Sequence, residues 1–289
     1  MATTADCAVV ATVFPSLNVT GSCCNSSLPI TCDGGRVTRL DLGSNALTGA
    51  LPSSIGRLTK LTYLEVSSNS LSGPLPESLG SLASLTELSL DRNAFSGPIP
   101  ESFGKLTKLI KLSMYNNRLS GNLPSSLGNL RKLDVLYLDN NTLAGPIGPV
   151  TSLTELSSLG LSYNQFSDSV KQLKKLTKLG SVWLESNLQL TGDFPSTVSP
   201  ATHCSMSDTD ICTSSATLQK ACNVPACPTS KSCTIPVEAF PTLDFGDNCC
   251  TSGYVTCNNS QITAVSLSGA NLRGSLPSSL GDLRSITSL

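Results

Sequence analysis

A 24-residue unit repeats three times, without insertion or deletion, between residues 61 and 132. The three copies read LTYLEVSSNSLSGPLPESLGSLAS, LTELSLDRNAFSGPIPESFGKLTK and LIKLSMYNNRLSGNLPSSLGNLRK. A fixed period of this length is typical of a solenoid, in which each unit contacts only its neighbours. One unit cannot bury its own leucines, so the leucines of successive units must stack into one continuous core. This repeat constrains the fold more than any other feature of the chain.

The spacing inside each unit, Leu-x-x-Leu-x-Leu-x-x-Asn-x-Leu, is that of a leucine-rich repeat. The pattern extends past the three perfect copies and predicts seven repeats across residues 37–202. An asparagine recurs after each expected strand, at Asn45, Asn69, Asn93, Asn117, Asn141, Asn164 and Asn187. Because an amide side chain both donates and accepts hydrogen bonds, we expect it to satisfy backbone groups of the turn. The sequence therefore predicts an α/β solenoid, a right-handed superhelix with a parallel β-sheet on its concave side.

A second element, Gly-x-Leu/Ile-Pro, follows the first four asparagines. Its residues are Gly49, Gly73, Gly97 and Gly121, with Pro52, Pro76, Pro100 and Pro124. Glycine permits a tight bend, and proline fits where no hydrogen-bond donor is needed. In repeat six Asp168 takes the place of the glycine and the proline is missing. We expect an irregular backbone there on the convex side, with the strands intact.

The twelve cysteines lie in three groups of four, outside the repeat tract. They are Cys7, Cys23, Cys24 and Cys32, then Cys204, Cys212, Cys222 and Cys227, then Cys233, Cys249, Cys250 and Cys257. This arrangement predicts disulfide caps formed in an oxidising compartment. Residues 1–36 are the expected N-terminal cap, and residues 203–232 are a C-terminal cap and linker without a repeat pattern. Sequence leaves three pairings open for the second group.

A zinc site at His203 and Cys204 is the alternative explanation for the second group of cysteines. The spacings match no Cys-x2-Cys pair, and His203 is the only histidine of the chain. We therefore predict no metal site and no cofactor.

The segment 233–289 repeats the start of the chain. Its cysteines keep the 16-residue step that separates Cys7 from Cys23. ITAVSLSGANLRGSLPSSLGDLRS then matches VTRLDLGSNALTGALPSSIGRLTK, with Ala270 in place of the asparagine. We expect a second N-terminal cap and the truncated start of a second repeat tract. Because barely one repeat follows this cap, we also expect the natural protein to be longer.

The order Cys, spacer, Cys-Cys and a further Cys, ahead of repeats with L-x-G-x-[IL]-P, resembles a known family. It is that of plant-type extracellular leucine-rich-repeat proteins, notably polygalacturonase-inhibiting proteins and the ectodomains of receptor-like kinases. The resemblance implies that Cys7 pairs with Cys23 and that Cys24 pairs with Cys32. It also implies ligand recognition through the variable outward positions of the concave strands. This chain departs from the family in having no Trp after the Cys-Cys doublet.

Charge and hydropathy exclude several classes of partner. The net charge is −1 and only 13% of the residues are charged, so no basic face is available for nucleic acid or an anionic membrane. No apolar run is long enough to span a membrane, and the N-terminus does not read as a signal peptide. The cysteines predict a secreted or cell-surface protein. Four glycosylation sequons agree with this location, at Asn18, Asn25, Asn140 and Asn258.

Aromatic residues gather at the outward positions of the expected concave sheet. Alternation along each strand turns the leucines inward and the intervening residues toward solvent. Four of the five tyrosines and the only tryptophan fall at outward positions. Exposed aromatic residues on one face are typical of interfaces, although tyrosine also fits a pleated surface well.

Gly160 lies between Tyr137 and Trp183 at equivalent positions of three successive repeats. Two strand spacings separate the aromatic residues by about 9.6 Å, so we expect an open slot that admits one planar ring. The alternative is that Gly160 only tolerates a local bend. The expected ligand-binding residues are Tyr115, Tyr137, Asp139, Gly160, Tyr163, Trp183 and Glu185. The acidic positions around Asp41, Glu65 and Asp91 are the next candidate.

An open sheet provides no water-excluding cleft for an acid, base, nucleophile or metal, so we predict that the protein is not an enzyme. Seven strands make a surface about 29 Å long, which suits a protein, peptide or glycan ligand. We predict an extracellular recognition module that binds such a ligand on its concave face. The alternative is a structural solenoid, an adhesive, wall or ice-contacting protein with a regular polar face. The mixture of charged and aromatic outward residues counts against that alternative.

Overall fold

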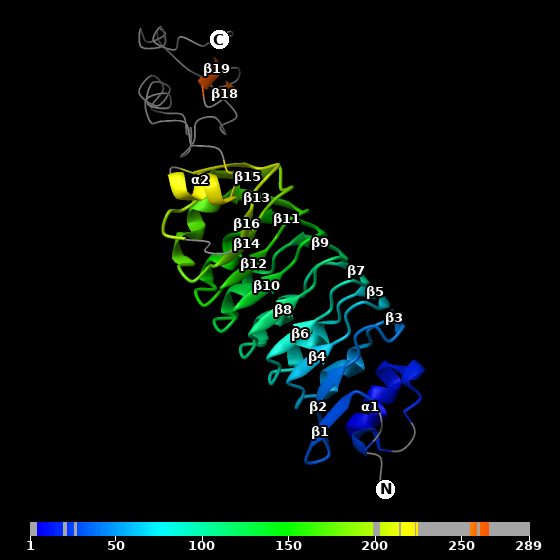
Figure 1. Ribbon diagram of the computed structural model, residues 1–289. Helices are drawn as coiled ribbons and strands as arrows, with labels where there is room; N and C mark the ends of the chain where they lie inside the picture. The colour runs from blue at the N-terminus through cyan, green and yellow to red at the C-terminus, as the bar shows by residue number, and fades with distance from the viewer. Residues whose placement is uncertain are drawn as a thin grey trace.

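The computed structural model shows a solenoid of stacked coils that runs from helix α1 (Ala5–Val13) to helix α2 (Ala216–Cys222) (Figure 1). The residues that the structure describes are 5–19, 22–25, 28–198, 203–213, 215–222, 224, 255–258 and 261–265. Each coil contributes one short strand to each of two sheets, and most coils add a 3-10 helix on the convex side. Within these described residues, no helix has the length and apolar character needed to cross a bilayer.

A nine-stranded sheet forms the concave side, as the leucine spacing predicts. Its strands, in order, are β1 (Ile30–Asp33), β2 (Arg36–Asp41), β4 (Tyr63–Glu65), β6 (Glu87–Ser89), β8 (Lys111–Ser113), β10 (Val135–Tyr137), β12 (Ser158–Gly160), β14 (Ser181–Trp183) and β16 (His203–Ser205). Apart from the antiparallel pair β1–β2, neighbours are parallel and equivalent residues align, as Leu112, Leu136 and Leu159 do. The outward positions of successive repeats therefore form straight rows across the sheet.

A second, eight-stranded sheet lies where sequence analysis predicts only a bend. Its strands are β3 (Thr48–Ala50), β5 (Ser70–Pro74), β7 (Ala94–Gly97), β9 (Arg118–Asn122), β11 (Thr142–Pro146), β13 (Gln165–Ser169), β15 (Gln189–Asp193) and β17 (Asp210–Cys212). They follow the repeated asparagines and include the glycines of the Gly-x-Leu/Ile-Pro element. The glycine of this element, Gly73 for example, has a φ of +79°, which L side chains rarely adopt.

The convex side carries one short 3-10 helix in each of the first six coils. They are η3 (Ser53–Arg57), η4 (Glu77–Ser81), η5 (Glu101–Lys105), η6 (Ser125–Asn129), η7 (Gly148–Ser152) and η8 (Val170–Lys175). Two more, η1 (Pro15–Leu17) and η2 (Cys23–Asn25), belong to the N-terminal cap. Between the sheets and the helices, stacked leucines form one continuous buried core, which also contains the fully buried Phe95, Phe103 and Phe166.

The repeated asparagines make the hydrogen bonds that the sequence predicts. Asn141 accepts a bond from the backbone N–H of Leu119 at 2.9 Å and donates to the carbonyl oxygens of Met114 and Leu138 at 3.1 and 3.0 Å. The same pattern recurs at Asn69, Asn93, Asn117, Asn164 and Asn187. Each of these six asparagines therefore joins two successive coils, whereas the side chain of Asn45, in the first coil, donates to the Gly43 carbonyl of its own coil at 2.8 Å.

Repeat six is irregular on its convex side, as expected. Asp168 has a φ of +105°, at the position where the other coils place glycine. The N–H of Ser169 donates to the Asp168 carboxylate at 2.8 Å, which partly offsets the strain. Strands β12 and β14 remain in register beside this irregularity.

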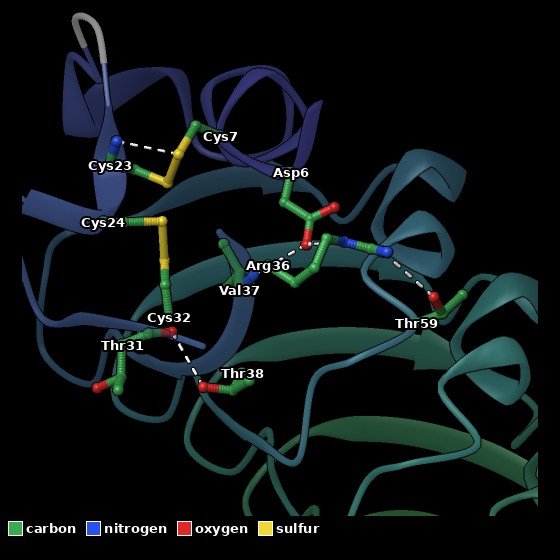
Figure 2. Close-up of polar contacts among 10 residues, drawn as sticks. All are labelled: Asp6, Cys7, Cys23, Cys24, Thr31, Cys32, Arg36, Val37, Thr38 and Thr59. Atoms are coloured by element: carbon green, nitrogen blue, oxygen red, sulfur yellow. Dashed lines mark hydrogen bonds and ion pairs between the residues drawn. A yellow bond between two sulfur atoms is a disulfide. The ribbon is translucent and has the colours of Figure 1, made fainter. Parts of the chain in front are cut away.

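Two disulfides close the N-terminal cap, Cys7–Cys23 and Cys24–Cys32 (Figure 2). Both pairings implied by the family resemblance are therefore confirmed. The three neighbouring sulfur atoms of Cys7, Cys23 and Cys24 lie close together, but all three are bonded in these disulfides.

Asp6 fastens this cap to the first repeat. Its carboxylate is buried and accepts hydrogen bonds from Arg36 Nε and from the backbone N–H of Val37, both at 2.9 Å (Figure 2). Helix α1 is thereby joined to strand β2 by a charged pair. Sequence analysis did not single out Asp6, because a lone aspartate near a helix start carries no specific signal.

The expectation that residues 203–232 are a cap and linker without a repeat pattern is wrong for the start of this segment. Strand β16 extends the concave sheet and β17 extends the second sheet, so this segment forms an eighth coil. Thr209 takes the place of the asparagine, donating to the Met206 carbonyl at 2.6 Å and accepting from the Ile211 N–H at 3.3 Å. Sequence hid this coil because Cys204 and Met206 replace leucines and threonine replaces asparagine.

The second cysteine group forms disulfides, which contradicts the zinc alternative. Cys204 is bonded to Cys222, so its sulfur is not available as a thiolate ligand. Cys212 is also disulfide-bonded. Cys227, the fourth member of this group, lies outside the described residues.

A separate two-stranded hairpin, β18 (Val255–Asn258) with β19 (Gln261–Val265), repeats the pairing of β1 with β2. Both hairpins are antiparallel, and both shift register immediately before a cysteine, Cys32 in the first and Cys257 in the second. The remaining expectations for 233–289, including the disulfides of the third group, fall outside the described residues.

Candidate ligand-binding site

Three adjacent strands of the concave sheet differ in the size of their outward side chains. Repeat six carries only small ones around β12, namely Ser158, Gly160 and Ser162. Larger side chains flank them, because register places Tyr137 of β10 and Trp183 of β14 on either side of Gly160. The small outward side chains of repeat six therefore form a low strip, bordered by the larger side chains of repeats five and seven.

Two adjoining hollows lie at this strip, with volumes of about 440 and 370 Å³. The larger is lined by Asn116, Asp139, Asn140, Ser162, Tyr163, Trp183 and Glu185. The smaller is lined by Tyr115, Tyr137, Asp139 and Trp183. The structure thus brings six of the seven expected site residues together. Asp139 and Trp183 border both hollows.

The expectation of an open slot above Gly160 is wrong. The rings of Tyr137 and Trp183 lie edge to face, with centroids 5.9 Å apart and an angle of 75° between their planes. A Cβ atom on Gly160 would collide with the carboxylate of Asp139, which covers this glycine. The space above Gly160 is closed because the rings of Tyr137 and Trp183 are in contact and the Asp139 carboxylate lies directly over the glycine.

Asp139 is largely buried within the site. Burial raises the pKa of its carboxyl from 3.8 to about 6, and the nearby charge of Glu185 adds to this effect. The backbone N–H of Ser162 donates to Asp139 Oδ1 at 3.0 Å, which acts in the opposite direction. The carboxyl of Asp139 therefore changes its charge close to pH 6.

Two polar atoms of the site are buried without a hydrogen-bond partner among the described residues. They are the hydroxyl oxygen of Ser162, whose residue is only 2% exposed, and Oε2 of Glu185. The Ser162 hydroxyl lies near the Asp139 carboxylate but forms no hydrogen bond of normal geometry with it. Buried polar atoms in native proteins are nearly always paired, so these two exceptions call for a physical reason.

The rim of the site is polar and exposed. Tyr163 is 56% exposed and has a φ of +53°. The side chain of Asn140 donates to Asn116 Oδ1 at 2.6 Å. Asn140 also begins an Asn-Asn-Thr sequon, so a glycan attached here would stand beside the mouth of the larger hollow.

A second group of acidic and aromatic residues, the Arg39 cluster, lies on the same sheet near the N-terminal cap. It consists of Arg39, Asp41, Tyr63 and Glu65. Arg39 pairs with Asp41 at 2.8 Å and places its guanidinium carbon 3.3 Å from the centre of the Tyr63 ring. The Tyr63 hydroxyl donates to Glu65 Oε2 at 3.3 Å, and the Ser67 hydroxyl donates to the other oxygen. The hydrogen bond to Asp41 raises the pKa of Arg39.

The carboxylates of Asp41 and Glu65, which sequence analysis ranked second as a binding site, are thus already bonded to other side chains of the protein. Asp91 belongs with them, since it is 7% exposed and accepts a hydrogen bond from Ser113 at 2.8 Å. In contrast, neither Asp139 nor Glu185 forms an ion pair within the described part of the chain. We call Tyr137, Asp139, Ser162, Trp183 and Glu185 the Asp139 cluster.

Sequence analysis missed Ser162, Asn116 and Asn140 as lining residues. A signal for Ser162 was present, because it occupies the same repeat position as Asp139 and Glu185. A small residue between two carboxylates at equivalent positions marks the low strip as well as Gly160 does.

Comparison with known proteins supports the repeat assignment. A model of the leucine-rich repeat region matches residues 92–199, and a leucine rich repeat model matches residues 35–95. Together they cover more than half of the 289-residue chain. No curated protein sequence matches the chain.

Three solved structures illustrate the structural similarity. The ectodomain of the plant membrane receptor kinase GASSHO1/SCHENGEN3 from Arabidopsis thaliana, in complex with CASPARIAN STRIP INTEGRITY FACTOR 2, is 37% identical with a TM-score of 0.54, covering 58% of this chain and 22% of that one. The plant peptide hormone receptor RGFR1, in complex with RGF2, is 33% identical with a TM-score of 0.56. The match covers 60% of this chain and 28% of the receptor chain. A plant ice-binding protein shares the fold at 22% identity and a TM-score of 0.52. The match covers 79% of this chain and 99% of the ice-binding protein.

This chain spans about a quarter of the length of the two receptor chains that it matches. The matches lie in leucine-rich repeats, and the repeats, ladder asparagines and N-terminal disulfides described above agree with them. The chain therefore belongs to the leucine-rich-repeat proteins, of the plant type found in receptor-kinase ectodomains.

Proposed function

We propose that this chain is a non-catalytic, extracellular recognition module that binds a peptide or protein ligand on its concave sheet, at the Asp139 cluster. The observation that carries the proposal is the pair of adjoining hollows lined by aromatic rings and by buried polar atoms without partners. One of the two receptors named above is a peptide hormone receptor solved in complex with RGF2, and the other was solved in complex with CASPARIAN STRIP INTEGRITY FACTOR 2, which favours a peptide or protein over a glycan. Disulfides at both ends of the repeat tract support a secreted or cell-surface location.

The shape of the surface also supports recognition. Trp183 and Tyr137 offer large contact area at low entropic cost, as the central residues of interfaces usually do. The hollows lie on an open sheet, so a ligand can extend along neighbouring strands on both sides. A ligand that spans several repeats fits this arrangement better than a small metabolite.

The test is binding to an immobilised library of synthetic peptides, comparing the unmodified chain with Trp183→Ala. Loss of the Trp183 ring is expected to weaken the selected ligands by about 2 kcal/mol or more. Tyr63→Ala is the matched control, because it removes an aromatic ring from the same sheet outside the proposed site. Selected ligands that bind both variants as tightly as the parent would show that the Asp139 cluster is not the site.

A structural or ice-contacting role is the other candidate, since a plant ice-binding protein shares the fold. That role requires a regular row of similar polar side chains. Here one row of equivalent positions changes from Asp41 and Glu65 to Tyr137, Gly160 and Trp183 along the sheet. Ice-growth inhibition by the unmodified protein, unaffected by Trp183→Ala, would favour this role over ligand recognition.

We also propose that residues 233–289 begin a second module of the same kind. The supporting observation is that β18–β19 repeats the register shift of β1–β2 before an equivalent cysteine. Peptide mapping under non-reducing conditions is expected to find the pairs Cys233–Cys249 and Cys250–Cys257. A disulfide between the outer members, Cys233 and Cys257, would contradict the proposal.

A further inference from the structure

The Asp139 cluster places two acidic side chains on either side of a buried serine. Asp139, Ser162 and Glu185 occupy equivalent positions of three successive repeats, so the backbones of the two acidic residues lie about 9.6 Å apart. Glu185 lies close enough for its charge to act on Asp139. A carboxylate withdrawn from water without a positive partner is unfavourable, and two near each other are more so.

Aromatic rings surround these carboxylates. Trp183 borders both hollows, its ring and that of Tyr137 pack in a T-shaped arrangement, and Tyr163 stands exposed at the rim of the larger hollow. The face of an indole or phenol ring attracts a cation, most strongly for tryptophan and where water is excluded. The site therefore combines the two features that favour a positively charged group.

Two buried atoms of the site that have no hydrogen-bond partner within the described part of the chain also favour a ligand group with N–H donors. The buried oxygens Ser162 Oγ and Glu185 Oε2 both accept hydrogen bonds, and both residues line the larger hollow. A ligand group that carries several N–H donors would satisfy them together with the Asp139 carboxylate. A ligand group that only accepts hydrogen bonds would leave both carboxylates without a positive partner and Glu185 Oε2 without a donor.

The Arg39 cluster is the same kind of site with its cation already present. Arg39 lies between the carboxylate of Asp41 and the ring of Tyr63. In repeats five to seven, the positions equivalent to Arg39 hold Val135, Ser158 and Ser181. None of these is basic. Lys111 of the preceding repeat and Arg92, which lies over the Tyr115 ring, are the nearest basic residues along the sheet, but neither forms an ion pair with Asp139 or Glu185 among the described residues.

We propose that the Asp139 cluster binds a cationic side chain of the ligand, with arginine as the preferred residue. The guanidinium lies between Asp139 and Glu185 and against the ring of Trp183. Arginine fits better than lysine because its planar head carries five N–H donors and reaches two separated acceptors at once. The inference rests on the proposed function, since it names the chemical group that the same site recognises.

The test uses Trp183 as its own reporter, because it is the only tryptophan of the chain. Its fluorescence is followed while the full chain, freed of N-glycans, is titrated with end-blocked pentapeptides Gly-Gly-X-Gly-Gly up to about 10 mM. X is arginine, lysine, citrulline or glutamate. Arginine and lysine are expected to give a saturable change, with arginine the tighter. Citrulline has nearly the shape of arginine without its charge and is expected to bind at least about tenfold more weakly.

Paired variants separate charge from shape. The double variant Asp139→Asn/Glu185→Gln keeps the size of both side chains and is expected to lose the arginine response by about tenfold or more. The matched control Asp41→Asn/Glu65→Gln changes two carboxylates of the Arg39 cluster and is expected to retain the response.

Equal binding of arginine and citrulline, an unchanged double variant, or no response to arginine at all would overturn the inference. These outcomes are distinguishable from failure of the proposed function. Library ligands that depend on Trp183 but need no basic residue would leave concave-face recognition standing and remove the cation. A library that yields no ligand dependent on Trp183, together with a charge-dependent arginine response, would remove peptide recognition and leave the cation site.

Discussion

Two clusters on one sheet contain the same kinds of side chain but differ in how their carboxylates are paired. In the Arg39 cluster, a guanidinium from the chain pairs with Asp41 and covers Tyr63. In the Asp139 cluster, Asp139 and Glu185 lie beside Trp183 without an ion pair among the described residues. A carboxylate beside an aromatic ring is thus not by itself a sign of a binding site. What distinguishes the two clusters is whether the chain supplies the cation.

The difference has a cause in the repeat. Each coil offers the same outward positions, and a single basic residue at one of them decides whether its acidic neighbours are neutralised internally. The Arg39 cluster is nearest the N-terminal cap, where Asp6 likewise pairs with Arg36 of strand β2. Charge on this part of the sheet is paired within the chain, whereas the carboxylates of the Asp139 cluster form no ion pair among the described residues.

The largest expected effect concerns the buried carboxyl of the Asp139 cluster. Its pKa is raised to about 6 from 3.8. Well below pH 4 the carboxyl is protonated in both the folded and the unfolded state, so the full stability of the folded state is present there. As the pH rises toward 6 and above, the unfolded state releases the proton first and this stability is lost, by up to about 3 kcal/mol.

Asp139→Asn cannot make this transition. The free energy of unfolding of the variant, relative to that of the parent, should therefore increase by up to about 3 kcal/mol between pH 4 and pH 7. Denaturant unfolding at a series of pH values measures the difference. Glu101→Gln is a control of opposite sign, because hydrogen bonds from Ser126 and Ser125 lower the pKa of Glu101. A pH-independent difference for Asp139→Asn would mean that this carboxyl is not held in a buried site.

The next effect concerns the two glycines that lie beneath carboxylates. A methyl group on Gly160 displaces the Asp139 carboxylate and breaks its hydrogen bond with the Ser162 N–H. We expect Gly160→Ala to lower the free energy of unfolding by about 1.5 kcal/mol. Gly43 is the counterpart beside the Arg39 cluster, where a Cβ atom would lie 3.2 Å from Glu65 Oε1. Gly43→Ala should change stability by less than about 0.5 kcal/mol, and an equal loss in both variants would remove this distinction.

These glycines also show how far sequence reasoning reached. The repeat phase placed Tyr137, Gly160 and Trp183 side by side correctly, because strand register follows directly from the leucine spacing. It did not reveal that the two rings lean together or that Asp139 covers Gly160. Those features depend on side-chain rotamers, which neighbouring coils determine and which a one-dimensional period does not contain.

The eighth coil shows a different limit. Its strands form although Cys204, Met206 and Thr209 stand where leucine, leucine and asparagine are expected. Other residues can fill the same space and make the same hydrogen bonds at these positions, although they do not match the leucine-rich-repeat motif. The disulfide pairs of the N-terminal cap, in contrast, followed from resemblance to a family and not from the spacing of the cysteines.

A smaller effect is expected on the convex side of repeat six, behind the Asp139 cluster. Asp168 has a φ of +105°, where the counterpart in the first half of the solenoid, Gly73, has +79°. Asp168→Gly should raise the free energy of unfolding by about 1 kcal/mol, because glycine adopts this conformation without strain. The reverse change, Gly73→Asp, should destabilise by a similar amount. Thermal unfolding measures both, and a destabilised Asp168→Gly would mean that the hydrogen bond from Ser169 outweighs the backbone strain.

The smallest effect tests the internal cation itself. Arg39→Gln removes the ion pair with Asp41 and the contact with Tyr63, yet both charged side chains are more than two-fifths exposed. Solvent and salt screen such a pair, so the loss of stability should be only about 0.5 kcal/mol and should shrink further in high salt. Arg57→Gln is the control, because it removes one positive charge from the exposed convex helix η3.

The same variant should convert the Arg39 cluster into an open site. With the guanidinium gone, Asp41, Tyr63 and Glu65 present the combination that the Asp139 cluster presents, and added arginine peptide should recover part of the lost stability. Recovery requires that the peptide bind the folded state more tightly than the unfolded one. Titration of Arg39→Gln in the background Asp139→Asn/Glu185→Gln isolates the new site. Recovery in Arg57→Gln as well would reduce the effect to general screening, whereas recovery confined to Arg39→Gln would show that a single basic residue decides which cluster needs a partner.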